Sequence, residues 1–270
     1  MSMQLLLIAI LGIVAALMQL ESADLFWAGL TQRYSSWALL IAGPWIIHKF
    51  LFWPISLFFL YVDKHNKPQF IAKYRIQQGA PKRPSMPQTL KVLAWNQIFW
   101  APLMLILMAW MLKLRGWEVE AQFPSWGQIS MELVGLGAIS AVIFYATHRF
   151  LHRPWWMKKV HRVHHEYKTT TSIASEYAHP VEFCIGNFGT LAGGVVLIAP
   201  TLFSIYLFTV LSIVTILIHH CGYALPWAPW SIPHDWHHYK YKEVFGTVGV
   251  MDRIFGTDQD FKKLQHDELY

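Results

Sequence analysis

The sequence has few charged residues and few cysteines for its length. Charged side chains make up 14% of the 270 residues, whereas hydrophobic residues make up 54% and the mean hydropathy is +0.31. An ordinary soluble domain carries about 25% charged residues, so a lipid bilayer is the expected solvent. The two cysteines, Cys184 and Cys221, form no spaced framework. This disfavours a disulfide scaffold and fits a reducing or membrane-buried setting.

Two catalytic fingerprints are also missing. No GxGxxG string marks a nucleotide or flavin site, so redox chemistry in this chain would need electrons from another protein. No HExxH string occurs either: His165 and Glu166 begin one, but the position of its second histidine holds Thr169. A zincin-type protease is therefore disfavoured.

The sequence contains several long runs of apolar residues. Runs at 4–20, 37–62, 90–112 and 129–147 match or approach the roughly 20 helical residues that cross a hydrocarbon core. A further apolar block, 183–218, is broken at Ala199 and Pro200 and predicts a helical hairpin. Its arms are each slightly short, so we expect them to dip into the bilayer and return rather than span it.

The predicted fold is therefore an all-α integral membrane protein with four transmembrane helices, a helical hairpin and a histidine-rich helical cap. We expect one membrane domain over 1–270. Within it, 1–147 supplies the N-terminal transmembrane helices, and 148–270 supplies the histidine-rich region together with the hairpin.

Positive charge orients these segments. Most of the 22 Lys and Arg residues fall in three stretches: between the second and third runs, after the fourth run, and after the hairpin. The opposite side receives only Arg33, Lys113 and Arg115. Alternating spans place the three basic stretches together, and positive residues favour the cytosolic side. We therefore expect the cap and both termini to be cytosolic.

Histidine is abundant and clustered. Of the 14 histidines, five lie within 148–165 and five within 219–238, each block directly after an apolar run. The string HRFLH spaces two of them at i, i+4, and HRVHH and HDWHH space three at i, i+3, i+4, so we expect each set to project from one helix face. The three boxes contain His148 and His152; His161, His164 and His165; and His234, His237 and His238.

Such boxes indicate bound metal. Eight imidazoles exceed what one tetrahedral or octahedral ion accepts, so two ions are expected. Imidazole suits Zn, Cu, Fe and Ni alike, so the spacing alone leaves the metal open. The isolated His48, His65 and His266 are interpreted as ordinary surface or capping residues.

The boxes and the strings around them resemble the fatty acid hydroxylase/sterol desaturase superfamily of membrane di-iron oxygenases, and within it the 4-methylsterol monooxygenases most closely. The resemblance implies two iron ions, with zinc possible as isolated, and O₂ as co-substrate. The implied reaction is hydroxylation or desaturation of an unactivated C–H bond in a sterol-like, isoprenoid or acyl lipid. The matching strings are KYRIQ (73–77), HRVHHEY (161–167), SEYAHP (175–180), HCGYALPWAP (220–229), HDWHH (234–238) and DRIFGTD (252–258).

The resemblance also implies a ligand set. His179 either binds metal or lies behind the ligands, and His220 is preferred to His219 because it heads the family string. Glu166, Glu176 and Asp235 are candidates to accept imidazole N–H groups. The implied metal ligands are His148, His152, His161, His164, His165, His179, His220, His234, His237 and His238.

The implied partners are a lipid that enters from the bilayer and an electron donor, either a b-type cytochrome or a ferredoxin with its reductase. A basic cytosolic face would attract such an acidic protein, and no nucleic-acid partner is expected. The membrane is the endoplasmic reticulum or a bacterial inner membrane. Three alternatives stay open: a fatty acyl hydroxylase rather than a sterol oxidase, a zinc-dependent membrane hydrolase, and a non-catalytic metal carrier.

Overall fold

The computed structural model describes residues 21–264, which form helices joined by loops and turns. One isolated bridge, between Arg75 and Tyr223, is the extended pairing recorded in this part of the chain. The predicted all-α class is confirmed. The apolar run at 4–20 and His266 lie outside the described residues.

Five helical stretches are long and apolar enough to cross a membrane. The shortest has 18 residues and rises about 27 Å, close to the roughly 30 Å hydrocarbon core. The runs predicted at 37–62, 90–112 and 129–147 lie within the first three stretches. The five are α3 (Ser36–His65), α5–η1–α6 (Met86–Ala94, Trp95–Trp100, Ala101–Leu114), α7 (Trp126–Leu151), α9–η5–α10 (Pro180–Glu182, Phe183–Phe188, Gly189–Ile198) and α11 (Leu202–His219).

The block at 183–218 is a hairpin, as predicted, but its arms are longer than expected. Pro180 begins the first arm and His219 ends the second, so both arms are candidate spans. Between them Ala199 adopts the left-handed conformation, with φ of 54°, and Pro200 has no N–H to continue a helix. The Thr201 hydroxyl then accepts the Ser204 N–H at 3.3 Å and caps α11. The expectation that both arms fall short of spanning is therefore corrected.

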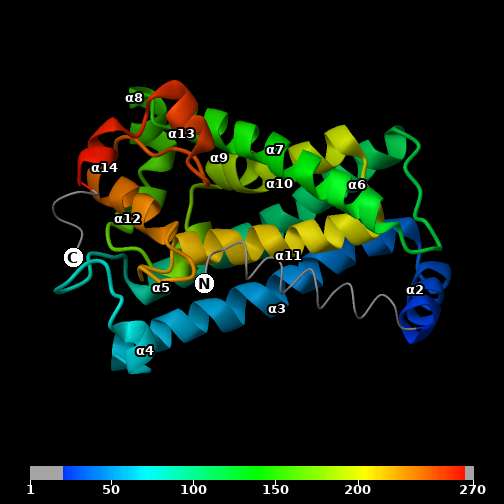
Figure 1. The fold of residues 1–270 in the computed structure, drawn as a ribbon, viewed down its shortest axis with the longest axis horizontal. Helices are drawn as coiled ribbons and strands as arrows, with labels where there is room; N and C mark the ends of the chain where they lie inside the picture. Colours follow the sequence, from blue (N-terminus) through cyan, green and yellow to red (C-terminus); the bar gives the residue numbers. More distant parts are fainter. Residues whose placement is uncertain (1–20, 265–270) are drawn as a thin grey trace.

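The long helices pack around a shared apolar core. Leu40, Leu112, Leu136 and Ile205 come from α3, α6, α7 and α11, and each is fully buried in that core. Figure 1 shows these helices side by side along the length of the molecule. At one end lie α8 (Pro154–Trp156), α12 (Ser231–Lys240), α13 (Val250–Phe255) and α14 (Gln259–Leu264), and the short α2 (Glu21–Arg33) lies at the other.

A network of hydrogen bonds attaches the histidine-rich end to Asp63, in the last turn of α3. The loop after α4 (Gln69–Ala72) carries Arg83, whose guanidinium donates to the carbonyls of Thr169 and Thr170 at 2.8 and 2.6 Å. The same guanidinium donates to Asp63 at 2.6 Å, and Asp63 also accepts the Tyr223 hydroxyl at 2.7 Å. Segments distant in sequence are thereby fixed together.

Three π-helical segments occur among the described residues: η1, η2 (Met157–His161) and η5. A π-helical turn inserts an extra residue and is frequent at functional sites. The first carries Gln97, the second ends at His161, and the third carries Asn187. His161 belongs to the histidine site, Asn187 lines the adjoining cavity, and Gln97 hydrogen-bonds Glu176 on the cavity wall.

Candidate metal centre and adjoining cavity

Nine of the ten predicted ligands converge at one end of the bundle, in two clusters. They come from the end of α7, from η2, from the turn η3 (His164–Glu166), from the residue after α11, and from α12. Within each cluster the candidate ligand atoms all lie within 4.8 Å of one another. The five-histidine cluster contains His148, His152, His161, His165 and His237, and the four-histidine cluster contains His164, His220, His234 and His238.

The Nε2 atoms in each cluster have the spacing of ligands around one ion. His152 Nε2 lies 2.9 Å from His161 Nε2. His234 Nε2 lies 2.8 Å from His220 Nε2 and 3.1 Å from His238 Nε2. With metal–nitrogen bonds of about 2.0–2.1 Å, neighbouring ligand nitrogens are about 2.9 Å apart in an octahedron and about 3.3 Å apart in a tetrahedron. The donor set therefore fits one metal ion per cluster.

The other ring nitrogen of most of these histidines is held by the backbone. A carbonyl oxygen can only accept, so each of these Nδ1 atoms carries the hydrogen and each Nε2 lone pair is left for a metal. The Nδ1-to-carbonyl distances are 2.8 Å for His148 to Phe245, 3.1 Å for His164 to Tyr177, 2.9 Å for His220 to Ile216, 2.7 Å for His237 to Glu243 and 2.9 Å for His238 to Tyr167.

A carboxylate takes this role for His161. Its Nδ1 lies 2.8 Å from Glu182 Oε1, and the Glu182 side chain is 5% exposed. Such an acceptor fixes the ring and increases its basicity toward metal. Sequence reasoning missed Glu182. The available signal was a carboxylate at the start of an apolar arm, where an ionisable group is costly unless it has a function.

Burial keeps the imidazoles in the metal-binding form. It lowers the pKa of His161 to about 3. Burial, and then repulsion from neighbouring imidazoles, holds the pKa values of His165 and His238 well below the usual range. These rings are therefore neutral at physiological pH, as metal binding requires.

The second and third boxes each contribute histidines to both clusters. In HDWHH, His234 and His238 belong to the four-histidine cluster, whereas His237 belongs to the five-histidine cluster. On a helix, residue i+4 lies about 40° from residue i, and residue i+3 lies about 60° to the other side. HRVHH is divided in the same way, although it lies where a π-helical turn meets a 3₁₀ turn. The expectation that all three rings project from one face is therefore corrected.

Two histidines in or beside the expected ligand set, His179 and His219, lie outside both clusters. His179 is the N-cap of α9, and its Nδ1 accepts the Val181 N–H at 3.2 Å. His219 is buried, and its ring stacks on that of His234 with centroids 5.7 Å apart. Of the adjacent pair, His220 is the one that joins the four-histidine cluster.

In the described part of the chain, the three carboxylates expected to orient ligand rings hydrogen-bond other groups and none of the clustered imidazoles. Glu166 accepts the Tyr177 hydroxyl at 2.6 Å, and Asp235 accepts the Thr170 hydroxyl at 2.6 Å. Glu176 pairs instead with a histidine of α3. Among the described carboxylates, Glu182 alone has the role for which these three were candidates.

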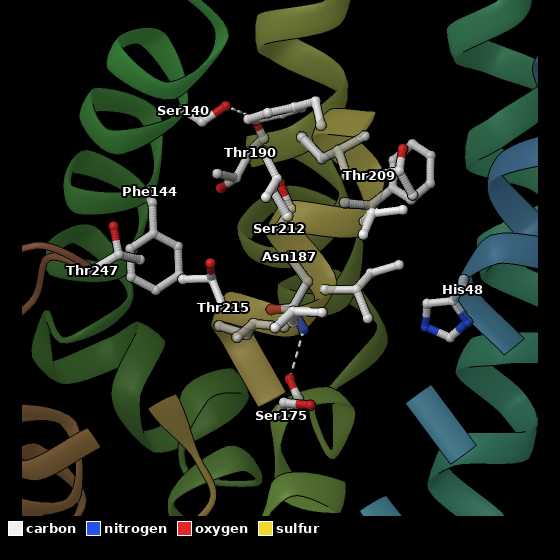
Figure 2. Close-up of a pocket in the computed structure, with 18 of the residues that line it drawn as sticks. His48, Ser140, Phe144, Ser175, Asn187, Thr190, Thr209, Ser212, Thr215 and Thr247 are labelled. Atoms are coloured by element: carbon white, nitrogen blue, oxygen red, sulfur yellow. Dashed lines mark hydrogen bonds between the residues drawn. The ribbon is translucent and has the colours of Figure 1, made fainter. Parts of the chain in front are cut away.

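A cavity of about 490 Å³ adjoins the metal centre, bounded by α3, α6, α7, η5 and α11. A smaller space of about 20 Å³ lies among histidines of both clusters. Figure 2 shows the larger cavity, in which hydroxyl groups such as those of Thr209 and Ser212 are scattered over an apolar wall. The two spaces share wall residues, so a ligand in the larger one approaches both clusters. The shared residues are Phe144, Ser175, Gly186, Asn187 and Ile216.

The fold and the clusters define a multi-pass membrane protein with a histidine-rich metal centre, and comparison with known proteins identifies its family. A family model described as fatty acid hydroxylase matches residues 133–257. Fatty acid hydroxylase domain-containing protein 2 from Homo sapiens is 34% identical over 230 residues, which cover 84% of this chain and 69% of that protein.

Two plant proteins are similar over almost their whole length. Methylsterol monooxygenase 2-2 from Arabidopsis thaliana is 31% identical over 252 residues, covering 88% of this chain and 93% of that protein. Very-long-chain aldehyde decarbonylase GL1-11 from Oryza sativa subsp. indica is 31% identical over 259 residues, covering 91% and 95%. No solved structure matches significantly. The chain belongs to the fatty acid hydroxylase family and is a lipid-modifying oxidoreductase of the membrane.

Proposed function

We propose that the protein is a di-iron oxygenase that hydroxylates or desaturates an unactivated C–H bond of a membrane lipid, using O₂ and two external electrons. The observation that supports this most directly is the contact between two all-imidazole clusters and a large apolar cavity. A hydrolase would need a carboxylate base beside the metals. Glu182, the carboxylate that lines the space among the histidines, is instead hydrogen-bonded to the His161 ring.

All nine converging histidines are proposed as ligands, five to one iron and four to the other. Bound iron would supply the activation of O₂ toward a C–H bond. The protein orients the rings through the carbonyl and carboxylate oxygens that accept each Nδ1–H, and its buried setting excludes water. His179 is proposed to cap α9 rather than to bind metal.

The cavity is proposed to hold the lipid. Its walls at Phe144 and Ile216 also border the space among the histidines. A hydrocarbon chain packed against them therefore places one C–H bond near the metals. Because the cavity is bounded by membrane helices, the substrate would enter sideways from the bilayer. The relatives named as acting on methylsterols and long-chain aldehydes favour a sterol-like, isoprenoid or acyl substrate.

The metal-binding end is proposed to face the cytosol, in the endoplasmic reticulum or a bacterial inner membrane. Exposed basic residues lie in the last turn of α7 and after it, on this end of the molecule. Positive residues favour the cytosolic side and would attract an acidic electron donor, a b-type cytochrome or a ferredoxin. These residues are Arg149, Arg153, Lys158, Lys159, Arg162 and Lys168.

The test is to purify the full-length protein anaerobically, quantify its metals, and supply reductant and ¹⁸O₂ to protein in membranes that contain sterol and acyl lipids. The proposal predicts about two irons per chain and either ¹⁸O in a lipid product or an O₂-dependent new double bond. Less than one iron with zinc in its place, or a product formed without O₂, would contradict it and favour the zinc hydrolase. If only acyl lipids changed, the sterol assignment would be lost and the oxygenase retained.

A further inference from the structure

A chain of polar side chains lies beside the cavity, apart from both metal clusters. His48 Nε2 hydrogen-bonds Glu176 Oε1, and Gln97 donates to Glu176 Oε2 at 2.6 Å. Lys49 Nζ donates to the Gln97 side-chain oxygen Oε1 at 2.7 Å. His48 and Glu176 both line the cavity wall.

This network occupies a costly position. His48 and Lys49 lie inside α3, and Gln97 lies inside the span that contains η1. Ionisable side chains within membrane spans are rare and usually mark a binding or transport site. The proposed metal chemistry makes no use of these groups, so they need another role.

The hydrogen-bonding pattern leaves one acceptor free. A carboxylate only accepts, so His48 Nε2 donates to Glu176. Burial favours a raised pKa for Glu176, but His48, Gln97 and Lys49 outweigh it and hold that pKa below its usual value. With the Nε2 hydrogen directed at Glu176, we take the His48 ring as the Nε2–H tautomer, in which Nδ1 keeps its lone pair.

His48 Nδ1 is then a lone-pair acceptor, and it has no hydrogen-bond partner among the described residues. The His48 side chain retains 18% exposure and the Glu176 side chain 13%. An apolar cavity with a few well-placed polar groups is typical of a site that orients a largely apolar ligand.

The acceptor lies across the cavity from the wall shared with the metal centre. Figure 2 shows His48 on one side of the cavity, and Phe144 and Thr247 on the other. Phe144 also borders the space among the histidines. A ligand anchored at His48 can therefore extend its hydrocarbon part toward the clusters.

We propose that His48, held by Glu176, binds the hydroxyl group of a lipid alcohol and so sets which carbon of the substrate reaches the metal centre. The inference rests on the proposed function, because it names the substrate class of the same cavity. An alcohol can donate to Nδ1, whereas an ether or a ketone cannot. A free fatty acid would bring its carboxylate toward the negative charge of Glu176.

The experiment measures binding to the purified full-length protein in nanodiscs. The probes are radiolabelled octadecan-1-ol, its methyl ether and octadecanoic acid, together with a 3-hydroxysterol and its 3-O-methyl ether. For at least one skeleton we expect the alcohol to bind about tenfold more tightly than the ether, the effect of one buried hydrogen bond. His48→Phe should reduce that preference to less than about twofold and leave ether affinity unchanged, since the ether makes no such bond. His65→Phe, an exposed position on the same helix, should keep the full preference.

Glu176→Gln removes the negative charge with little change in shape, so octadecanoic acid should bind more tightly to this variant than to the wild type. Retained ether binding in each variant shows that the cavity is intact. Equal binding of alcohol and ether, binding of neither, or a preference that survives in His48→Phe would overturn the inference. If the protein nevertheless contains two irons and oxidises a lipid with O₂, the proposed function stands. If hydroxyl-selective binding occurs but the protein contains no iron and shows no O₂-dependent activity, the binding inference stands and the proposed function fails.

Discussion

Glu182 Oε1 lies 2.8 Å from His161 Nδ1, joining the start of the hairpin to the end of a π-helical turn. Both side chains are almost completely buried. The hairpin is thereby linked to the five-histidine cluster, and the ring that Glu182 holds presents its Nε2 to the other histidines of that cluster.

Replacing Glu182 should weaken metal binding without removing a ligand. We expect Glu182→Gln to lower the metal affinity of the five-histidine cluster about tenfold, and Glu182→Ala to lower it more. Acceptors behind ligand imidazoles contribute about 10- to 100-fold to metal affinity. The measurement is metal release to a chelator of known affinity. Glu118→Gln, a carboxylate with a 71% exposed side chain, is the matched control and should behave as wild type. Unchanged affinity in Glu182→Ala would show that the pair is only structural.

The division of each HxxHH box predicts a pattern in double variants. His161→Ala with His165→Ala removes two ligands from the five-histidine cluster and should leave about one ion per chain. His164→Ala with His165→Ala removes one ligand from each cluster and should reduce binding at both. His179→Ala, outside both clusters, should keep two ions.

Quantifying metal after equilibration with a weak chelator distinguishes these cases. If the His164→Ala, His165→Ala variant and the His161→Ala, His165→Ala variant each lost the same single ion, the two-cluster arrangement would be wrong.

The helical fold and most of the histidines that converge could be predicted from the sequence because each depends on local pattern. Apolar runs define the spans, and repeated i, i+3, i+4 spacing identifies the histidines. Which histidine belongs to which cluster depends on how rings from five segments meet, and that required the three-dimensional arrangement. His179 belongs to one of the matching strings, and the structure places it outside both clusters, at the start of a helix.

The features that were missed are long-range. Glu182 and His161 are 21 residues apart, and His48 and Glu176 are 128 apart. His48 was interpreted as an ordinary residue because no pattern near it in sequence indicates a partner. The hairpin arms were underestimated because Pro180 and His219 extend them beyond the apolar run.

The metal-free protein should lose stability as pH falls. The pKa of His161 is about 3 in the folded chain, against an ordinary value of 6.5. The unfolded state therefore binds more protons below about pH 6.5, so this group's contribution is complete above that pH and is lost progressively toward pH 3. At pH 5.5 the stability lost through this one group is about 1.4 kcal/mol relative to high pH.

The measurement is thermal unfolding of chelator-stripped protein in nanodiscs at pH 7.5 and 5.5, with a lower midpoint expected at pH 5.5. His65→Phe should show the same dependence, because that ring is exposed. An equal midpoint at both pH values would mean that the buried rings already carry protons or are not buried.

Filling the cavity should block turnover and spare the metals. Ser212 lies on the cavity wall (Figure 2), so Ser212→Phe introduces a ring where the lipid is proposed to lie. We expect roughly a hundredfold loss of lipid oxidation, since small displacements of a substrate are that costly, with metal content unchanged. Val142→Phe places the same ring on an exposed face of α7, where Val142 is 50% exposed, and should keep full activity. Full activity in Ser212→Phe would place the substrate elsewhere.

The most direct test of the metal centre is an experimental structure of the anaerobically purified protein, with anomalous diffraction collected at the iron absorption edge. The account predicts two iron peaks, one within Nε2 bonding distance of the five-histidine cluster and one within that of the four-histidine cluster. A single peak, no peak, or imidazole rings that point away from one another would contradict it.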